Sequence, residues 1–175
     1  MSTTPYLVEI CRLLVGFTLL AAAIGKIATF KQFSSDLSDS LKLSEHWSLS
    51  VTSLLVITEL LLSMLILLNN HYGYMAMAIA AIMLSGFTLY IFVSLLQDKL
   101  IRCNCFGQSN DSISYFDVSR NLVLMIAASF YLLNQQTIAI DTISQCLLGF
   151  VALSILLIIT HLHELTLVTR NPKAS

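Results

Sequence analysis

The residues of this chain best suited to chemistry are two cysteines that one residue separates. Cys103 and Cys105 belong to the sequence Cys-Asn-Cys-Phe-Gly at residues 103–107, in a polar stretch between two apolar segments. Thiols this close together close a strained disulfide, hold a soft metal or exchange electrons with another thiol pair. A Cys-x-Cys ring departs from relaxed disulfide geometry, and a strained bridge is easily reduced. The pair is a candidate redox site, and two ordinary loop cysteines are the alternative.

The neighbours of the pair favour reactivity. Arg102 precedes Cys103 and favours the thiolate, which is the reactive form of the group. Gly107 permits a turn that brings backbone close to the sulfur atoms. We therefore expect Cys103 to be the attacking thiol. Cys11 and Cys146 lie inside apolar segments, where a free cysteine packs as a small hydrophobic residue.

The composition predicts a membrane protein. Of the 175 residues, 57% are hydrophobic and 11% are charged, whereas a soluble domain carries about a quarter charged residues. The mean hydropathy is +0.82. No run of like charge is present that would bind nucleic acid, so nucleic acid is not expected as a partner. The expected partner of the surface is the lipid bilayer.

The apolar residues come in blocks whose length suits a bilayer, which a helix crosses with about 20 residues. The expected spans are residues 7–28, 47–68, 74–96, 122–133 and 138–162. The fourth block is short and reaches full length only with its polar flanks. We expect five crossings, and four crossings with one half-inserted helix are the alternative. The polar connection at residues 29–46 is expected on the same membrane side as the cysteine segment.

Glu59 is an ionisable residue near the middle of the second apolar block. A charge at that depth costs roughly 3 kcal/mol or more, so the carboxyl group should face the bundle and find a partner or a proton. Lys26, near the end of the first block, is the expected partner, and Arg120 is the second choice. A carboxylic acid that burial keeps neutral is the alternative.

Arg120 and Asn121 open the fourth apolar block. Snorkelling to the membrane interface is the default expectation for an arginine there. The alternative is that Arg120 points to the cysteine segment and stabilises a thiolate or a bound anionic group. Glu9 and Arg12, one helical turn apart, are interpreted as an interfacial ion pair and little else.

Histidines provide further candidate metal ligands. With five crossings, His46 and His161 share a membrane side with the cysteine pair, so a Cys/His metal site is an alternative function. His161 and His163, however, are two residues apart and face different ways on a helix. We therefore predict no metal site.

In the order of its landmark residues the chain resembles the family of the methylamine utilisation protein MauE, which is related to the DoxX-like membrane proteins. The Cys-x-Cys-Phe-Gly element is the most specific landmark, and the match covers about residues 12–133. The landmarks are Gly16-Phe17, Ala23-Ile24-Gly25-Lys26, Phe30, Phe33, Glu59-Leu60, Leu67-Leu68, Cys103-Asn104-Cys105-Phe106-Gly107 and Arg120-Asn121.

The resemblance implies a four-helix core like that of other membrane thiol-redox proteins. The expected fold is all-α, a polytopic membrane helical bundle that consists of a four-helix core and an extra C-terminal transmembrane helix. We predict a single integral membrane domain over residues 1–175, with the MauE-like or DoxX-like region at about 7–135. The additional span at about 138–162 departs from the family pattern.

The resemblance also implies disulfide handling. Cys103 and Cys105 would exchange electrons with a thioredoxin-like partner and support disulfide formation or maturation of exported proteins. The supporting residues would be Arg102, Gly107, Arg120, Asn121, Glu59 and Lys26. By analogy a membrane quinone is a candidate second electron partner, and no other cofactor is expected. The residues leave open whether the protein is a thiol–disulfide oxidoreductase or a non-enzymatic scaffold that docks a redox partner. None of them points to methylamine.

Two arguments disagree on the membrane side of the cysteine segment. Of nine Lys and Arg residues, all but Arg12 fall on that side, and the positive-inside rule would make it cytoplasmic. Disulfide chemistry and the family favour the oxidising side. We follow the latter and expect a multi-pass protein of the bacterial inner membrane with a periplasmic or extracellular cysteine segment.

Overall fold

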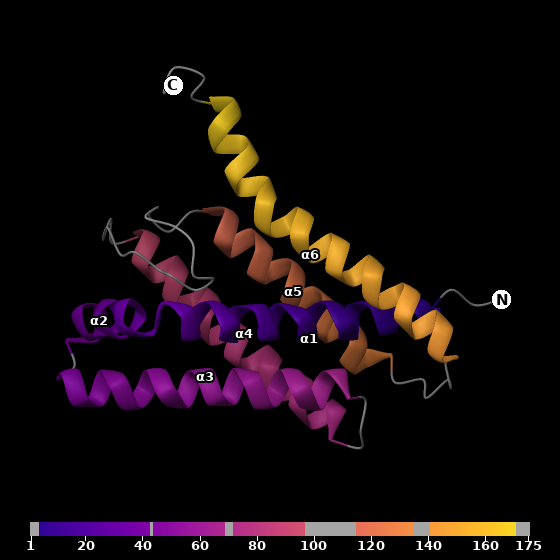
Figure 1. Ribbon diagram of the computed structural model, residues 1–175, viewed down its shortest axis with the longest axis horizontal. Coiled ribbons are helices and arrows are strands. Elements are labelled where there is room, and N and C mark those ends of the chain that lie inside the picture. The colour runs from indigo at the N-terminus through magenta and orange to yellow at the C-terminus, as the bar shows by residue number, and fades with distance from the viewer. Residues whose placement is uncertain (1–3, 43, 69–71, 97–114, 135–140, 171–175) are drawn as a thin grey trace.

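The computed structural model describes residues 4–42, 44–68, 72–96, 115–134 and 141–170. Every regular element within these ranges is a helix, which confirms the all-α prediction. The helices are α1 (Thr4–Ala28), α2 (Phe30–Leu41), α3 (Glu45–Leu67), α4 (Gly73–Leu96), α5 (Tyr115–Leu133) and α6 (Thr142–Arg170) (Figure 1). Arg102, Cys103, Cys105 and Gly107 lie outside the described residues.

The helices α1, α3 and α4 are long and apolar enough to cross a membrane, and the protein is a membrane protein on this criterion. Their bounds lie within three residues of the predicted spans. The described apolar parts of the last two helices are shorter, at Val118–Leu133 in α5 and Ile143–Ile158 in α6. The choice between five crossings and four therefore stays a prediction, as does the division into a four-helix core and an extra helix.

Helix α1 is the central element of the bundle. It packs against α3, α5 and α6, and it also touches α2. Within its most apolar stretch 61% of the residues are buried, against 33% in α3 and 28% in α4. Figure 1 shows α3 running alongside α1, with α6 crossing obliquely on the opposite side. Because α1 is covered on several sides, polar residues on it are buried in protein and not in lipid.

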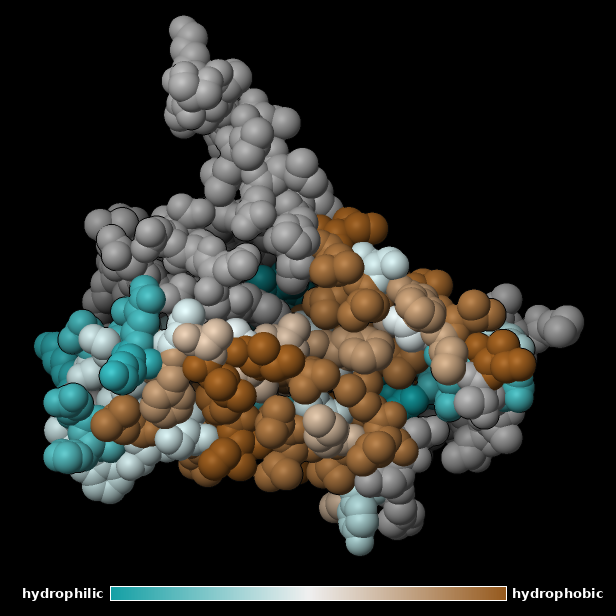
Figure 2. Space-filling model, viewed as in Figure 1, coloured by the Kyte–Doolittle hydropathy of each residue, from teal (hydrophilic) through white to brown (hydrophobic). Residues whose placement is uncertain are grey.

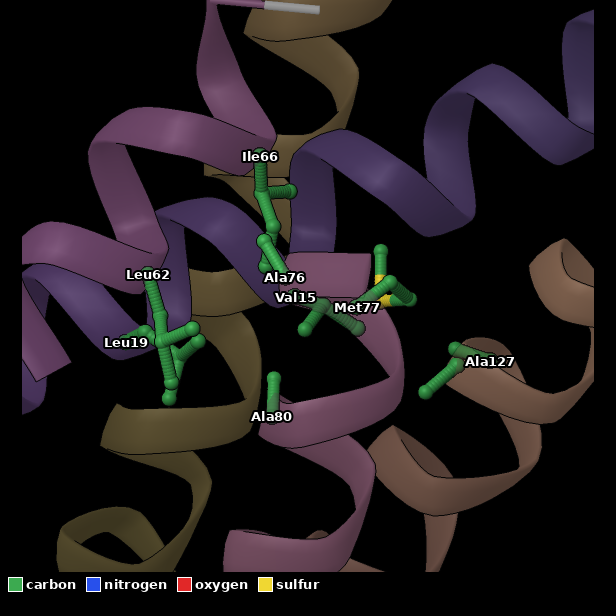
Figure 3. Close-up of a cluster of buried hydrophobic side chains, with 9 residues drawn as sticks. Val15, Leu19, Leu62, Ile66, Ala76, Met77, Ala80 and Ala127 are labelled. Carbon is green, nitrogen blue, oxygen red and sulfur yellow. The ribbon is translucent and has the colours of Figure 1, made fainter. Parts of the chain in front are cut away.

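Two apolar clusters hold α3, α4, α5 and α6 to α1. The first joins α1, α3, α4 and α5, and most of its members appear in Figure 3. It consists of Val15, Leu19, Leu62, Ile66, Ala76, Met77, Ala80, Ala127 and Ala128. The second joins α1, α4, α5 and α6 through Leu13, Leu14, Leu84, Leu124, Ala152 and Leu156. The alanines allow the helix backbones to approach closely, which is how helices associate in a membrane.

Close contact between α1 and α3 depends on Gly16. A Cβ atom at this position would lie 2.8 Å from Leu67 Cδ2 and 3.2 Å from Ile66 Cγ2. At distances this short a larger residue requires the Leu67 and Ile66 side chains, or α3 itself, to shift. Gly16 thus sets the spacing of the two helices that carry the ionisable residues of the bundle.

The polar connection between α1 and α3 contains a helix that the sequence interpretation did not predict. Helix α2 is short and amphipathic, and its inner face buries Phe33 and Ser34. The Ser34 and Ser48 hydroxyls lie 3.1 Å apart and join α2 to the start of α3. Lys42 ends α2 in the left-handed conformation, with φ of 53°. Helix α2 therefore folds back onto α3 as part of the bundle.

One end of the molecule gathers the end of α1, all of α2 and the start of α3 (Figure 1). The end of α4 and the start of α5 lie at this end too, and we call it the Lys26 end. Figure 2 shows an apolar surface over the middle of the molecule and hydrophilic residues around α2. Large hydrophobic side chains such as Leu54, Ile57 and Leu61 of α3 are exposed, as expected for residues that face lipid.

Candidate functional site

The candidate site is a buried ion pair between α1 and α3. Lys26 Nζ lies 2.5 Å from Glu59 Oε1, and both side chains are only 2% exposed. This confirms the prediction that Glu59 pairs with Lys26. A buried pair must regain by mutual attraction and hydrogen bonding what both groups lose in hydration. Such a pair marks a position where the chain requires polar groups inside the membrane region.

Backbone direction explains how the two residues meet. The Cα–Cβ bonds of a helix tilt toward its N-terminus, so both side chains lean back along their own helices. Lys26 stands two residues before the end of α1 and therefore leans toward the interior of the bundle. Glu59 on α3 likewise leans toward the Lys26 end. The lysine consequently reaches inward to the carboxylate and does not extend to the membrane border.

Two aromatic rings enclose the lysine ammonium group. Lys26 Nζ lies 5.1 Å from the ring centroid of Phe87 on α4 and 5.7 Å from that of Phe33 on α2. Both distances fall within the range of cation–π attraction. The rings offset part of the cost of burying the ammonium. Phe87 carries no sequence feature that would have separated it from the other aromatic residues of the apolar blocks.

Arg120 and Asn121 bring α5 to the same place. Both residues are buried, and they line a small cavity together with Lys26 and Glu59. The prediction that Arg120 snorkels to the membrane interface is therefore wrong. Helix α5 packs against α1 and α4, so the first turns of α5 face the bundle and turn the guanidinium inward.

The cavity has a volume of about 30 Å³. The rest of its lining is mainly apolar and comes from α1, α4 and α5, with Thr18, Leu19, Ala22, Met83, Leu84, Phe87, Ile91 and Leu124. The lining carries two cationic side chains and one carboxylate. Among the described residues Glu59 Oε2 is a buried oxygen with no hydrogen-bond partner, although Glu59 Oε1 is bonded to Lys26. The cavity therefore offers a hydrogen-bond acceptor within a mainly apolar lining.

A second buried ionic cluster lies toward the opposite end of α1. Arg12 Nη2 lies 2.5 Å from Glu9 Oε1, and Arg12 Nε donates to Glu9 Oε2 over 3.0 Å. Arg12 Nη1 donates to the carbonyl oxygens of Ile66 and Leu67 at the end of α3. Gln145 of α6 donates to Glu9 over 3.5 Å.

The predicted ion pair between Glu9 and Arg12 is confirmed, but the interpretation that it is interfacial and does little else is wrong. Arg12 is buried and supplies hydrogen bonds to carbonyl groups in the last turn of α3, where a helix needs donors from outside itself. Its positive charge also lies at the negative end of the α3 dipole. The cluster joins α1, α3 and α6, and its role is explained by helix capping and packing.

The structure does not test the remaining sequence candidates. The cysteine pair, Arg102 and Gly107 are outside the described residues, and so is any contact between them and the Lys26–Glu59 cavity. Among the described residues no group of three or more His, Cys, Asp or Glu side chains is placed to hold a metal ion. Cys11 is partly buried and Cys146 is exposed, and each is a free thiol.

The arrangement limits what the site does chemically. Lys26 and Glu59 are bonded to each other, and two aromatic rings lie against Lys26, so the pair joins the last turn of α1 to the middle of α3. A carboxylate with a free acceptor oxygen beside a cavity also binds a hydrogen-bond donor or takes up a proton.

Comparison with known proteins gives one family. The model of the family described as methylamine utilisation protein MauE matches residues 4–134. This range covers α1 to α5 and ends before α6. No curated protein matches the chain, and no solved structure matches it.

Proposed function

The chain belongs to the MauE family of membrane proteins, and from this we propose that it is a membrane thiol–disulfide redox protein. The observation that carries the proposal is the Cys-Asn-Cys-Phe-Gly sequence at residues 103–107, between two helices of the family region. Two thiols at this spacing are suited to exchange with an external disulfide. The proposed partner is a thioredoxin-like protein, and the proposed role is disulfide formation or maturation of exported proteins.

The ends of the flanking helices support this proposal. Helix α4 ends at Leu96 and α5 begins at Tyr115, and the lining of the cavity places both of these ends at the Lys26 end of the bundle. Helix α2 adds a polar surface at the same end. A soluble partner that approaches the cysteine segment would therefore meet the polar end of the molecule.

We assign Lys26, Glu59, Arg120 and Asn121 positioning roles. They join α1, α3 and α5 at the point where the chain enters α5 from the cysteine segment. A defined start of α5 limits the positions that the preceding residues can take. Arg102 is proposed to favour the thiolate of its neighbour, and Gly107 is proposed to allow the turn beside the pair.

The proposed exchange balances atoms and electrons. The Cys103 thiolate attacks one sulfur of a partner disulfide, and the other partner sulfur leaves as a thiolate that takes up a proton. Cys105, after losing its proton, then attacks Cys103 and releases the second partner thiolate, which is protonated in turn. The pair is oxidised to a disulfide and the partner is reduced by two electrons. The reverse sequence oxidises the partner, and the difference in reduction potential sets the direction.

A membrane quinone remains the proposed second electron partner by analogy alone. The cavity at Lys26 and Glu59 does not fit a quinone ring. An apolar cavity that binds benzene has a volume of about 150 Å³, whereas this cavity has about 30 Å³. Any quinone site would have to lie elsewhere on the chain, and we derive no step through it.

We propose that the protein lies in the bacterial inner membrane with the cysteine segment on the periplasmic side. The buried state of Lys26 and Arg120 supports this choice. The positive-inside rule counts cations in loops, and these two residues lie inside the bundle. Removing them from the count weakens the argument for a cytoplasmic cysteine segment. Labelling of intact cells with a membrane-impermeant thiol reagent tests the side directly.

The redox proposal is tested with single cysteine variants. Cys103→Ser and Cys105→Ser are each expected to abolish oxidation or reduction of a thioredoxin-like partner, and Cys105→Ser is expected to accumulate a mixed disulfide through Cys103. Cys11→Ser and Cys146→Ser are the matched controls and are expected to keep full exchange. Full exchange in both loop variants would contradict the proposal.

A scaffold without redox activity, which docks a redox partner through the cysteine segment, is the second candidate. Gel mobility after thiol alkylation, with and without reductant, separates the two. A pair that never oxidises in cells is the result expected of a scaffold. Metal that stays with the purified protein through dialysis would instead favour the Cys/His metal site with His46 or His161.

A further inference from the structure

The cavity beside Glu59 contains an unused hydrogen-bond acceptor that the redox proposal does not explain. Glu59 is 2% exposed, it lines the cavity, and its Oε2 atom has no partner among the described residues. Leaving a buried acceptor unsatisfied destabilises the folded state, and the penalty is larger for a charged group. The position therefore requires a ligand that donates a hydrogen bond.

The cavity volume identifies the class of that ligand. A water molecule needs roughly 10–15 Å³ of such a cavity, so about 30 Å³ holds two waters. Water also fits the chemistry, because it donates to the carboxylate and accepts from the cationic and amide groups of the lining. A halide ion accepts hydrogen bonds but has none to donate to Glu59 Oε2.

A second buried oxygen without a hydrogen-bond partner, the hydroxyl of Thr52, lies on the same face of α3 among the described residues. Thr52 is fully buried, and its Oγ1 atom has no hydrogen-bond partner among the described residues. Other helical threonines donate to the carbonyl four residues earlier, as Thr58 does to Leu54 over 2.7 Å. Thr52 lies about 10 Å from Glu59 along the helix axis and one turn from Ser48.

Ser48 connects this face to α2 at the polar end of the molecule through its hydrogen bonds with Ser34. Buried residues Ser48, Thr52 and Glu59 thus follow one another from the start of α3 toward the cavity. Val56 lies between Thr52 and Glu59 on this face and contributes no polar atom. A water bound to Thr52 Oγ1 would bridge part of the distance between the polar atoms of Thr52 and Glu59.

We propose that the cavity is a hydrated proton-exchange site, in which Glu59 takes up and releases a proton through water that enters along the Ser34–Ser48–Thr52 face. In the exchange a hydronium ion gives a proton to Glu59 Oε2, and the products are a neutral carboxyl group and water. Lys26 keeps its hydrogen bond to Glu59 Oε1 in both states. The site stands independently of the cysteine pair.

Charged groups from two other helices surround the carboxyl group of Glu59. Helix α1 contributes the Lys26 ammonium and α5 contributes the Arg120 guanidinium, while α4 contributes only apolar residues to the cavity. Helix α2 contributes the Phe33 ring, which lies against Lys26. Glu59 is the one carboxylate in the described lining, so a proton that enters the cavity has a single acceptor of this kind.

Infrared difference spectroscopy on the full chain in phosphatidylcholine vesicles tests the proposal. Spectra recorded at high and low pH are expected to differ by a carboxylic-acid C=O band that disappears in Glu59→Gln. Glu45→Gln, the same change at an exposed residue of α3, is the matched control and is expected to keep this band. In D₂O the band is expected to move to lower frequency as the carboxyl proton exchanges.

The route is tested by the rate of that movement. Thr52→Val removes the hydroxyl at almost constant volume and is expected to slow exchange about tenfold, which corresponds to the loss of one ordinary hydrogen bond. Thr58→Val makes the same change off the buried face and is expected to leave the rate unchanged. Equal rates in Thr52→Val and the unmodified protein would overturn the route.

Three results would overturn the site itself. They are the absence of a titrating carboxyl band in the unmodified protein, a band that persists in Glu59→Gln, and a band that D₂O does not shift. If Glu59→Gln does not fold, the double variant Lys26→Met with Glu59→Gln removes both charges together and serves in its place. The spectra are expected to be the same in a chain that also carries Cys103→Ser, so failure of the redox proposal leaves this result intact.

Discussion

Loss of one member of the Lys26–Glu59 ion pair is expected to destabilise the bundle strongly, whereas loss of both members together is not. Replacing Lys26 with Met removes the ammonium but keeps an unbranched side chain against Phe33 and Phe87, and sulfur makes favourable contacts with aromatic rings. The ring distances of 5.1 and 5.7 Å leave room for such contacts. The variant thus isolates the effect of the charge.

The magnitude follows from the burial of both groups. Both side chains are 2% exposed, and removing one partner of such a pair costs about 3–5 kcal/mol. For a chain of this size about 2–4 °C of melting temperature corresponds to each kcal/mol, so Lys26→Met is expected to lower Tm by about 6–20 °C. Glu59→Leu is expected to lower it further, because two cationic side chains then line the cavity without a carboxylate.

The double variant Lys26→Met with Glu59→Leu provides the decisive comparison. Replacing both members of a buried pair with apolar residues is often neutral or stabilising by about 1–4 kcal/mol. The double variant is therefore expected to melt above either single variant. Thermal unfolding in detergent, followed by circular dichroism, measures all three. Lys31→Met and Glu45→Leu make similar changes at exposed residues and are expected to have little effect.

A double variant that is as unstable as the two single effects added together would refute this reasoning. Additivity would mean that the two side chains contribute separately, as residues without contact do. The 2.5 Å contact and the shared burial would then have no energetic consequence.

Two further predictions concern the packing of α1 against α3, and both are measured by the same thermal unfolding. Arg12→Lys is expected to destabilise the protein by about 2 kcal/mol. An ammonium group does not reproduce the bidentate pair with Glu9 or the hydrogen bonds to the α3 carbonyls. Equal stability of this variant and the unmodified protein would contradict the capping role of Arg12. Gly16→Ala is expected to cost about 1–3 kcal/mol through overpacking against Leu67. Gly86→Ala meets no atom within 4 Å and is expected to stabilise α4 by about 0.5–1 kcal/mol; an equal loss in both glycine variants would contradict the argument from spacing.

The spans that the sequence predicts best are those bounded by sharp changes in polarity. Residues 74–96 were expected as a span and α4 occupies Gly73–Leu96. The apolar length of a crossing is set by the bilayer, so composition alone locates it. Helix α2 was not predicted because it is 12 residues long and its mixed polar sequence has no bilayer-length signature. Its helical form depends on burying Phe33 and Ser34 against α3, which is a tertiary effect.

The sequence predicts those parts of the candidate site in which a residue is costly to place in a membrane. Glu59 is expensive in a membrane wherever it lies, and that cost predicted both its burial in the bundle and its pairing with Lys26. Arg120 and Arg12 stand near the ends of apolar blocks, where snorkelling satisfies them at no cost in packing. Their burial depends on which helix covers them, and no local pattern contains that information.

The two buried ionic clusters on α1 differ in whether both oxygens of their carboxylate accept hydrogen bonds. Arg12 and Lys26 are about 21 Å apart along the helix axis. At the first cluster both oxygens of Glu9 accept hydrogen bonds from Arg12, and the remaining donors of Arg12 reach α3 carbonyls. At the second cluster Glu59 keeps one oxygen unused beside a cavity. A cluster built only to hold helices together gains nothing from an unsatisfied buried oxygen, which is costly to retain. The unused oxygen of Glu59 is therefore the feature of the bundle that packing does not explain, and it directs experiments to the Lys26 end.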